Sequence, residues 1–298
     1  MIALTRRQFA AFVGACVLAP HAFAQKDGAS PLMRAIPRSG EPLPTVGLGT
    51  AGVFDRDGDA TRKTATEVVH ALLDGGGRLI DTASTYGDAE IVLGKVMAAD
   101  NLRERIFVAT KLEEPDEDEL KRSLARLRTP KLDLLQLHNV HDTRQSLAKF
   151  RGWKTQGVCR YVGITSTYHN HFDAVEAVLA REKPDFVQID YSLDERTVEA
   201  KILPLAADVG AGVLTALPFG RGRLFRAVRG KEIPDWARPF AGSWAEFFLK
   251  YLLADTRVTA VIPGTTSAAH MRDNLGAMRG PLPDAGQRKR MVAFIANL

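Results

Sequence analysis

Eight short apolar runs, separated by stretches of helical period, constrain this sequence more than any other feature. The runs centre on residues 46–48, 79–81, 106–108, 134–137, 161–164, 186–189, 213–215 and 258–262. Each is apolar at nearly every position, as strands buried on both faces of a parallel sheet must be. Alternation of strands and helices is typical of βα units. Eight such units in 298 residues have the size of a closed barrel, so we predict the α/β class and a (β/α)8 TIM barrel over residues 44–298.

The segments between the runs predict helices that cover this barrel. Phe172 and Val175, for example, fall on one helical face, which indicates a helix with one side toward the core. A helix through Val68 and Leu72 should end at residues 75–77, because three glycines there can supply the left-handed turn into the next strand. No G-x-G-x-x-G turn follows the first run, which disfavours an open, doubly wound sheet.

The first 24 residues have the composition of an export signal. They contain no acidic side chain, Arg6 and Arg7 precede an apolar stretch, and small residues lead up to Ala24. An arginine pair followed by an aromatic residue resembles the twin-arginine signal, which exports folded proteins. We therefore predict a twin-arginine-type signal peptide at 1–24, cleaved near Ala24. The twin-arginine export machinery would then be a partner, and the mature protein would be periplasmic or otherwise exported.

Two other interpretations of this segment stay open: a basic tail on a cytoplasmic protein, or a lipoprotein signal that anchors the chain through Cys16. Its apolar stretch is shorter than the roughly 20 residues of a permanent membrane helix, and no later segment is both long and uncharged. We therefore expect no stable membrane span. Residues 25–43, with their Gly, Ser and Pro, are predicted to form a linker that could include a small hairpin below the barrel.

Charge and cysteine content narrow the classes further. Lys and Arg number 40 against 35 Asp and Glu, a net charge of +5 without a basic stripe, so we expect no nucleic-acid partner. The two cysteines are Cys16, inside the signal, and Cys159. A mature domain with one cysteine has no internal disulfide, and we interpret Cys159 as a buried structural residue.

Four polar side chains follow three successive apolar runs. Asp81 ends the second run with Tyr86 just beyond it, while Lys111 ends the third and His138 the fourth. Side chains at the carboxyl ends of barrel strands converge on one mouth. A phenol donates a proton poorly at neutral pH unless a cation stabilises the phenolate. Lys111 could supply that charge, Asp81 could keep it protonated, and neutral His138 could hydrogen-bond a carbonyl oxygen. The set predicts carbonyl reduction.

Each of these residues alone also has a structural interpretation, as a cap, a packed aromatic, a salt-bridge partner or a core histidine. Their joint placement at one mouth favours function. Two other classes stay open. One is a metal-dependent barrel hydrolase or isomerase, because His138, His141 and Asp142 are potential ligands beside Asp81; no further His or Cys cluster completes such a site, and we predict no metal. The other is a non-catalytic, reductase-like binding protein.

Motifs along the chain resemble, in order, those of the aldo-keto reductase superfamily. They are GLGT at 47–50, DTASTYG at 81–87, ATK at 109–111, LH at 137–138 and GITS at 163–166. The resemblance runs from about residue 37 to about residue 275. It implies a (β/α)8 fold with a nicotinamide dinucleotide across the barrel mouth. It also implies that Tyr86 is the general acid, that Asp81 and Lys111 tune it, and that His138 orients a small-molecule carbonyl or alcohol.

The resemblance further implies which residues hold the cofactor. They are Gly49, Thr50, Thr165, Ser166, Gln188, Leu217, Pro218, Gly220, Gly222, Gly264, Thr265, Thr266, His270 and Asn274. Of these, Thr165, Ser166 and Gln188 would hold the carboxamide, and the glycine-rich loop 217–224 would wrap the pyrophosphate.

Two departures from the family pattern bear on the cofactor. The family usually has an aromatic residue where Leu217 stands, and a lysine and an arginine where Gly264 and His270 stand. A lost lysine weakens selectivity for a phosphate. We expect NADP(H) in preference to NAD(H). Since a free nicotinamide pool is not normally available outside the cytoplasm, we also hypothesise that the nucleotide is tightly bound and exported inside the folded protein.

Overall fold

The computed structural model describes residues 30–298. The predicted signal peptide at 1–24, the cleavage point near Ala24 and the alternative anchor Cys16 lie outside the described residues. No helix within residues 30–298 is long and apolar enough to cross a membrane.

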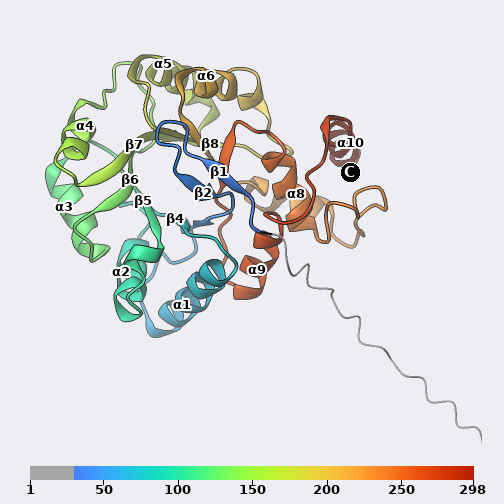
Figure 1. Cartoon of the computed structure of the whole chain (residues 1–298), viewed down its shortest axis with the longest axis horizontal. Coiled ribbons are helices and arrows are strands. Elements are labelled where there is room, and N and C mark those ends of the chain that lie inside the picture. Colours follow the sequence, from blue (N-terminus) through green and yellow to red (C-terminus); the bar gives the residue numbers. More distant parts are fainter. Residues whose placement is uncertain (1–29) are drawn as a thin grey trace, which may run out of the picture.

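Eight parallel strands form the centre of the described structure (Figure 1). They are β3 (Leu48–Gly49), β4 (Leu79–Asp81), β5 (Phe107–Leu112), β6 (Leu132–Leu137), β7 (Cys159–Ser166), β8 (Phe186–Asp190), β9 (Gly212–Ala216) and β10 (Val258–Val261). Their order in the sheet follows the chain from β3 to β10. Parallel bridges between Val46 and Val261 and between Gly49 and Gly264 join the first strand to the last. The predicted (β/α)8 barrel is confirmed.

The seam between β3 and β10 depends on a glycine. Gly49 donates its N–H to Pro263 O at 3.1 Å, and a Cβ at Gly49 would come within 2.8 Å of Ile262 O. A larger residue would therefore separate the two strands that close the barrel, which explains why glycine stands at the end of the first apolar run.

Helices surround the strands, as Figure 1 shows. Those between successive strands are α1 (Asp59–Asp74), α2 (Ala89–Ala99), α3 (Glu117–Arg126), α4 (Ala148–Thr155), α5 (Phe172–Glu182), α6 (Ile202–Val209), α7 (Arg223–Ala227) and α8 (Trp244–Leu253), and after β10 come α9 (Ala268–Gly276) and α10 (Ala285–Ala296). The α1 helix ends with Gly75 as its C-cap. The α3 helix begins where the Asp116 side chain accepts from Glu119 N at 2.7 Å, so the acidic segment caps it.

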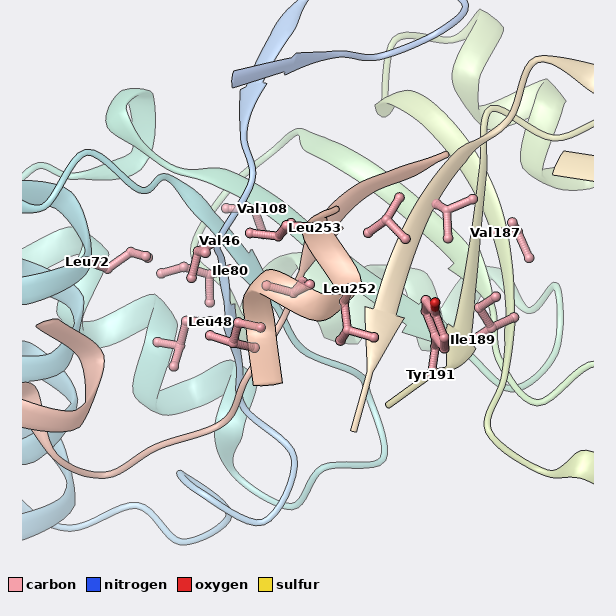
Figure 2. Packing of buried hydrophobic residues seen from close by; sticks show 14 of the residues in the cluster. Val46, Leu48, Leu72, Ile80, Val108, Val187, Ile189, Tyr191, Leu252 and Leu253 are labelled. Carbon is pink, nitrogen blue, oxygen red and sulfur yellow. The ribbon is translucent and has the colours of Figure 1, made fainter. Parts of the chain in front are cut away.

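The apolar core has two layers because each barrel strand is buried on both faces. Inside the barrel lie, among others, Leu79, Phe107, Leu134 and Phe186. The second layer, between strands and helices, is the larger, and Figure 2 shows part of it. Residues from strands, such as Ile80 and Val187, there meet helical side chains that include Leu72 of α1 and Leu252 and Leu253 of α8.

A short hairpin lies across one end of the barrel (Figure 1). Its strands β1 (Met33–Ala35) and β2 (Pro42–Pro44) pair antiparallel. Ile36 and Leu43 are fully buried and join the layer inside the barrel. They meet residues such as Leu79 and Phe107 that begin strands, so the hairpin closes the amino-terminal end and leaves the carboxyl end as the mouth.

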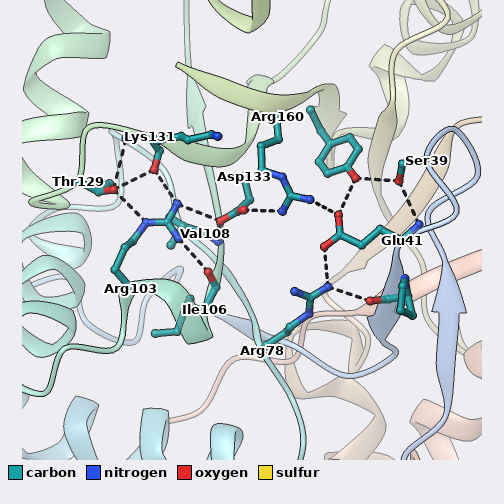
Figure 3. Close-up of polar contacts among 12 residues, drawn as sticks. Ser39, Glu41, Arg78, Arg103, Ile106, Val108, Thr129, Lys131, Asp133 and Arg160 are labelled. Atoms are coloured by element: carbon teal, nitrogen blue, oxygen red, sulfur yellow. Dashed lines mark hydrogen bonds and ion pairs between the residues drawn. The ribbon is translucent and has the colours of Figure 1, made fainter. Parts of the chain in front are cut away.

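Polar contacts tie this hairpin to the barrel strands (Figure 3). The Glu41 carboxylate accepts from Arg78 at 2.7 Å and from the Tyr161 hydroxyl at 2.7 Å, and it pairs with Arg160. Arg160 also donates to Asp133 at 2.9 Å. The Glu41 carboxylate thus accepts hydrogen bonds from side chains of β7 and of the residue before β4. These contacts hold the β1–β2 hairpin against the end of the barrel.

Candidate active site

A cavity of about 740 Å³ opens at the carboxyl ends of the strands. Asp81, Tyr86 and His138 line it, and Lys111 is completely buried beneath them. The four residues predicted to act together therefore lie at one mouth.

The base of the site is a buried ion pair. Lys111 Nζ lies 2.5 Å from Asp81 Oδ1 and donates to Thr82 O at 2.7 Å. Burial alone lowers the pKa of Lys111, but the charge of Asp81 and the influence of Tyr86 outweigh it, so the pKa lies above the ordinary value of 10.5. Burial raises the pKa of Asp81, and the attraction of Lys111 offsets that rise only in part. The lysine therefore stays protonated at neutral pH.

Two glutamines fix the carboxylate. Gln136 Nε2 donates to Asp81 Oδ2 at 3.2 Å, and Gln188 Nε2 donates to Asp81 Oδ1 at 3.1 Å. Gln136 Nε2 also donates to Gln188 Oε1 at 2.8 Å. Since β6 and β8 supply these glutamines and β4 supplies Asp81, the strand framework itself sets the direction of the carboxylate.

Tyr86 lies over the lysine. Lys111 Nζ is 4.8 Å from the centroid of the Tyr86 ring, a distance at which an ammonium and an aromatic ring attract. The turn that carries Tyr86 requires Gly87, whose φ is +55° and whose added Cβ would overlap Asp55 O. The ring is half-buried and faces the cavity, so the phenol is next to a fixed cation and within reach of a ligand.

His138 completes the group from the end of β6. Its backbone N–H donates to Leu112 O at 2.8 Å, and its ring lies edge-on to Tyr86 with centroids 5.7 Å apart. Burial, followed by the charge of Lys111, lowers the pKa of His138 to about 4, although Glu113 acts in the opposite direction. The imidazole is therefore neutral at physiological pH.

Glu113 is a site residue that the sequence reasoning missed. Its Oε1 lies 2.6 Å from His138 Nδ1, and the side chain lines the cavity. The period of two residues in a strand could have identified it, because Glu113 falls two positions after Lys111 and so turns to the same face. Asn139 and Tyr168 also line the cavity and were likewise not predicted.

The implied cofactor positions divide into two groups. The cavity wall includes Gly49, Thr50, Thr165, Gln188, Leu217, Pro218, Gly222 and Gly264. It does not include Ser166, Gly220, Thr265, Thr266, His270 or Asn274. Some of the second group serve local structure: Ser166 Oγ accepts from Tyr168 N at 3.3 Å, and Thr265 Oγ1 accepts from Ser267 N at 3.0 Å.

The loop after β9 has an unusual backbone. Leu217, Gly220, Arg221 and Gly222 all have φ in the left-handed region, at +52°, +55°, +53° and +80°. Glycine adopts such values freely, whereas leucine and arginine do so at a cost. A strained loop that lines the cavity is typical of a ligand-binding segment.

The cavity wall combines polar and apolar groups that fit a nicotinamide ring and its carboxamide. Thr50 Oγ1 is buried without a hydrogen-bond partner at the cavity wall, and polar groups of Thr165 and Gln188 share that wall with apolar Leu217 and Ile262. By contrast, no three His, Cys, Asp or Glu side chains in residues 30–298 are arranged to hold a metal ion. The His141 ring turns to His171, with centroids 5.9 Å apart.

Comparison with known proteins gives a consistent family and fold. The sequence model of the "Aldo/keto reductase family" matches residues 45–289. "Uncharacterized oxidoreductase YrpG" of Bacillus subtilis is 28% identical over 74% of this chain and 83% of its own length. "Methylglyoxal reductase YeaE" of Escherichia coli is 26% identical over 82% of this chain and 88% of its own length.

Solved structures show the same fold. An aldo-keto reductase from Klebsiella pneumoniae, in complex with NADPH, superposes with a TM-score of 0.75 at 22% identity, over 90% of this chain and 96% of the other. The aldo-keto reductase AKR11C1 from Bacillus halodurans, in its holo form, superposes with a TM-score of 0.70 at 22% identity, over 89% and 96%.

Proposed function

The chain belongs to the aldo/keto reductase family, and we propose that it reduces an aldehyde or ketone, or oxidises the corresponding alcohol, with Tyr86 as the proton donor and acceptor. One observation carries the proposal: the Tyr86 ring lies 4.8 Å from Lys111 Nζ, which is itself paired with Asp81. A fixed cation beside a phenol favours the phenolate that remains after proton donation.

Each residue of the group has a distinct part in this reaction. Lys111 stabilises the charge that develops on the Tyr86 oxygen, and Asp81 keeps the ammonium protonated and in place. Neutral His138 hydrogen-bonds the substrate oxygen and so directs the carbonyl toward Tyr86. When bound, the nicotinamide supplies or accepts the hydride.

For the cofactor we propose NADP(H) ahead of NAD(H). The Klebsiella pneumoniae reductase that shares this fold was crystallised with NADPH, which supports the choice. Thr165, Ser166 and Gln188 would hold the carboxamide, and the loop 217–224 would hold the pyrophosphate. Gly264 and His270 take the places where the family usually has basic residues, so we expect modest discrimination between the two nucleotides.

The decisive experiment separates nucleotide binding from chemistry. NADPH and NADH are titrated by fluorescence into the parent protein and into Tyr86→Phe, and reduction of methylglyoxal, the substrate in the name of the Escherichia coli relative, is assayed with other small aldehydes. We expect the variant to bind nucleotide as the parent does while kcat/KM falls by about 10²–10⁴-fold, the range of general acid catalysis. Binding without any turnover by the parent would favour the non-catalytic alternative, and absence of binding would refute the proposal.

We further propose that residues 1–24 direct export by the twin-arginine route with the nucleotide already bound. The supporting observation is the pair Arg6 and Arg7 before an apolar stretch. Replacing both arginines by lysine should retain the protein in the cytoplasm, whereas Cys16→Ala should not alter its release. A membrane-bound mature form that Cys16→Ala makes soluble would establish the lipoprotein alternative. Exported protein that has lost all nucleotide would refute the carried cofactor.

A further inference from the structure

Four acidic, basic or histidine side chains line the cavity in the described part of the chain: Asp81, Glu113, His138 and Arg221. Two of them contribute no net charge toward a ligand. Asp81 is matched by Lys111 at 2.5 Å, and His138 is neutral because burial lowers its pKa to about 4. Glu113 and Arg221 therefore set the charge that a ligand meets.

The strands that precede these two residues lie on opposite sides of the barrel. Glu113 directly follows β5, and Arg221 follows β9. In a closed barrel of eight strands in chain order, β5 and β9 are four strands apart, which is half of the circumference. Arg221 belongs to the loop that the proposed function assigns to the pyrophosphate, and that anion would offset its charge. Glu113 belongs to the side of His138.

The contacts of Glu113 leave its charge uncompensated. Besides His138 Nδ1 at 2.6 Å, they are Asn139 Nδ2 at 3.4 Å and Thr85 Oγ1 at 3.3 Å. All three partners are uncharged at neutral pH, and none of the ion pairs found in residues 30–298 joins Glu113 to a lysine or an arginine. The side chain is 41% exposed, so the carboxylate faces the space where a substrate would lie.

The position of Glu113 places this charge next to the proposed reaction. Thr85, which it contacts, is the residue before Tyr86, and His138 is the residue that would orient the substrate oxygen. The chain continues as Glu114, Pro115 and then Asp116 to Glu119, so an acidic rim leads to the same side of the mouth.

We propose that Glu113 is a specificity-determining residue that makes the site favour uncharged and cationic carbonyl substrates over anionic ones. The inference rests on the proposed function, because it concerns the substrate of that same site. Glu113 Oε1 also lies 2.6 Å from His138 Nδ1, so the charge stands beside the residue that would bind the substrate oxygen.

The test uses three para-substituted benzaldehydes of similar shape: the anion 4-carboxybenzaldehyde, its neutral isostere 4-formylbenzamide and the cation 4-(trimethylammonio)benzaldehyde. Values of kcat/KM are measured for the parent and for Glu113→Gln, with NADPH and with NADH. Any effect that acts through His138 is shared by the three probes, so the ratio of kcat/KM for a charged probe to kcat/KM for the neutral probe isolates the effect of charge.

In Glu113→Gln we expect the anion-to-amide ratio of kcat/KM to rise about tenfold, as Coulomb's law gives for unit charges about 8 Å apart at an effective dielectric constant of about 30. The cation-to-amide ratio should fall.

Two further variants define the outcome. Glu113→Asp keeps the charge and should keep the discrimination against the anion. Glu114→Gln removes one charge from the adjacent exposed residue, which does not line the cavity, and should change both ratios by less than about twofold, as expected for a screened surface charge. If the parent reduces the amide but Glu113→Gln leaves both ratios unchanged, or if Glu114→Gln shifts them equally, the inference is wrong and the proposed function stands. A parent that reduces neither these probes nor methylglyoxal with either nucleotide overturns both.

Discussion

Lys111 Nζ lies 2.5 Å from Asp81 Oδ1 in the floor of the barrel mouth, with the two side chains 0% and 3% exposed. Removing two charges from water is costly, and the fold offsets that cost through the donors that Gln136 and Gln188 direct at Asp81. Substituting one residue of such a pair leaves the other charge buried and unpaired, which is strongly destabilising. Substituting both residues leaves no unpaired charge.

Stability and activity should therefore separate in variants of this pair. Asp81→Asn is expected to lower the free energy of unfolding by about 3–5 kcal/mol, and Lys111→Met by a similar amount, since each leaves one buried charge unpaired. The double variant Asp81→Asn/Lys111→Met should recover most of the loss, yet it should stay inactive. Urea denaturation and carbonyl reduction are measured on all three. A double variant as unstable as the sum of the single ones would show that the two residues do not act as a pair.

His138 gives a pH dependence with a defined sign. Its pKa in the folded protein is about 4, against an ordinary value of 6.5. As the pH falls below 6.5, this histidine becomes protonated in the unfolded chain, but in the folded protein it stays neutral until the pH approaches about 4. Folding stability is therefore lost across that pH range. Between pH 7 and pH 5 the free energy of unfolding of the parent should fall by about 2 kcal/mol more than that of His138→Gln. From pH 7 to pH 8 the two should change in parallel. Equal losses on the acid side would contradict the prediction.

The positions of the strands and the grouping of Asp81, Tyr86, Lys111 and His138 at one mouth could be predicted because both depend on a local pattern. A buried parallel strand is apolar throughout, and the carboxyl ends of the strands meet at the mouth of the barrel. Which of the neighbouring side chains reach the cavity is harder to predict, because it also depends on the alternation of side chains along each strand and on how adjacent strands lie. Thr165 lines the cavity while Ser166 does not, since successive residues of a strand face opposite ways. The approach of Glu113 to His138 depends on how β5 and β6 lie side by side, which no single segment encodes.

The crossing of α2 and α3 depends on one glycine. A Cβ at Gly94 would overlap Arg126 O, whereas a Cβ at Gly152 in α4 would meet nothing within 4 Å. The same change should thus have opposite signs in two helices. Gly94→Ala should destabilise by about 1–3 kcal/mol through overpacking, while Gly152→Ala should stabilise by about 0.5–1 kcal/mol through helix propensity. Thermal unfolding of the two variants measures both, and a stabilising Gly94→Ala would mean that α3 moves away freely.

Glu41 allows the two ends of the barrel to be tested independently. Burial alone raises its pKa, but the hydrogen bonds from Tyr161, Arg78 and Arg160 outweigh it, so the pKa lies below the ordinary 4.5. A carboxylate with a depressed pKa stabilises the fold at higher pH, and that contribution is lost as the pH falls through the folded value. Glu41→Gln should therefore cost about 1 kcal/mol at pH 7, after allowance for solvent screening, and the gap to the parent should close toward pH 3. Glu232→Gln, at a side chain that is 89% exposed, is the control and should leave the stability unchanged.

Because the hairpin closes the end opposite the mouth, Glu41→Gln should keep the kcat/KM of the parent at temperatures where it is folded. If Glu41→Gln lost turnover while it stayed folded, the hairpin and the candidate active site would be coupled through the barrel interior.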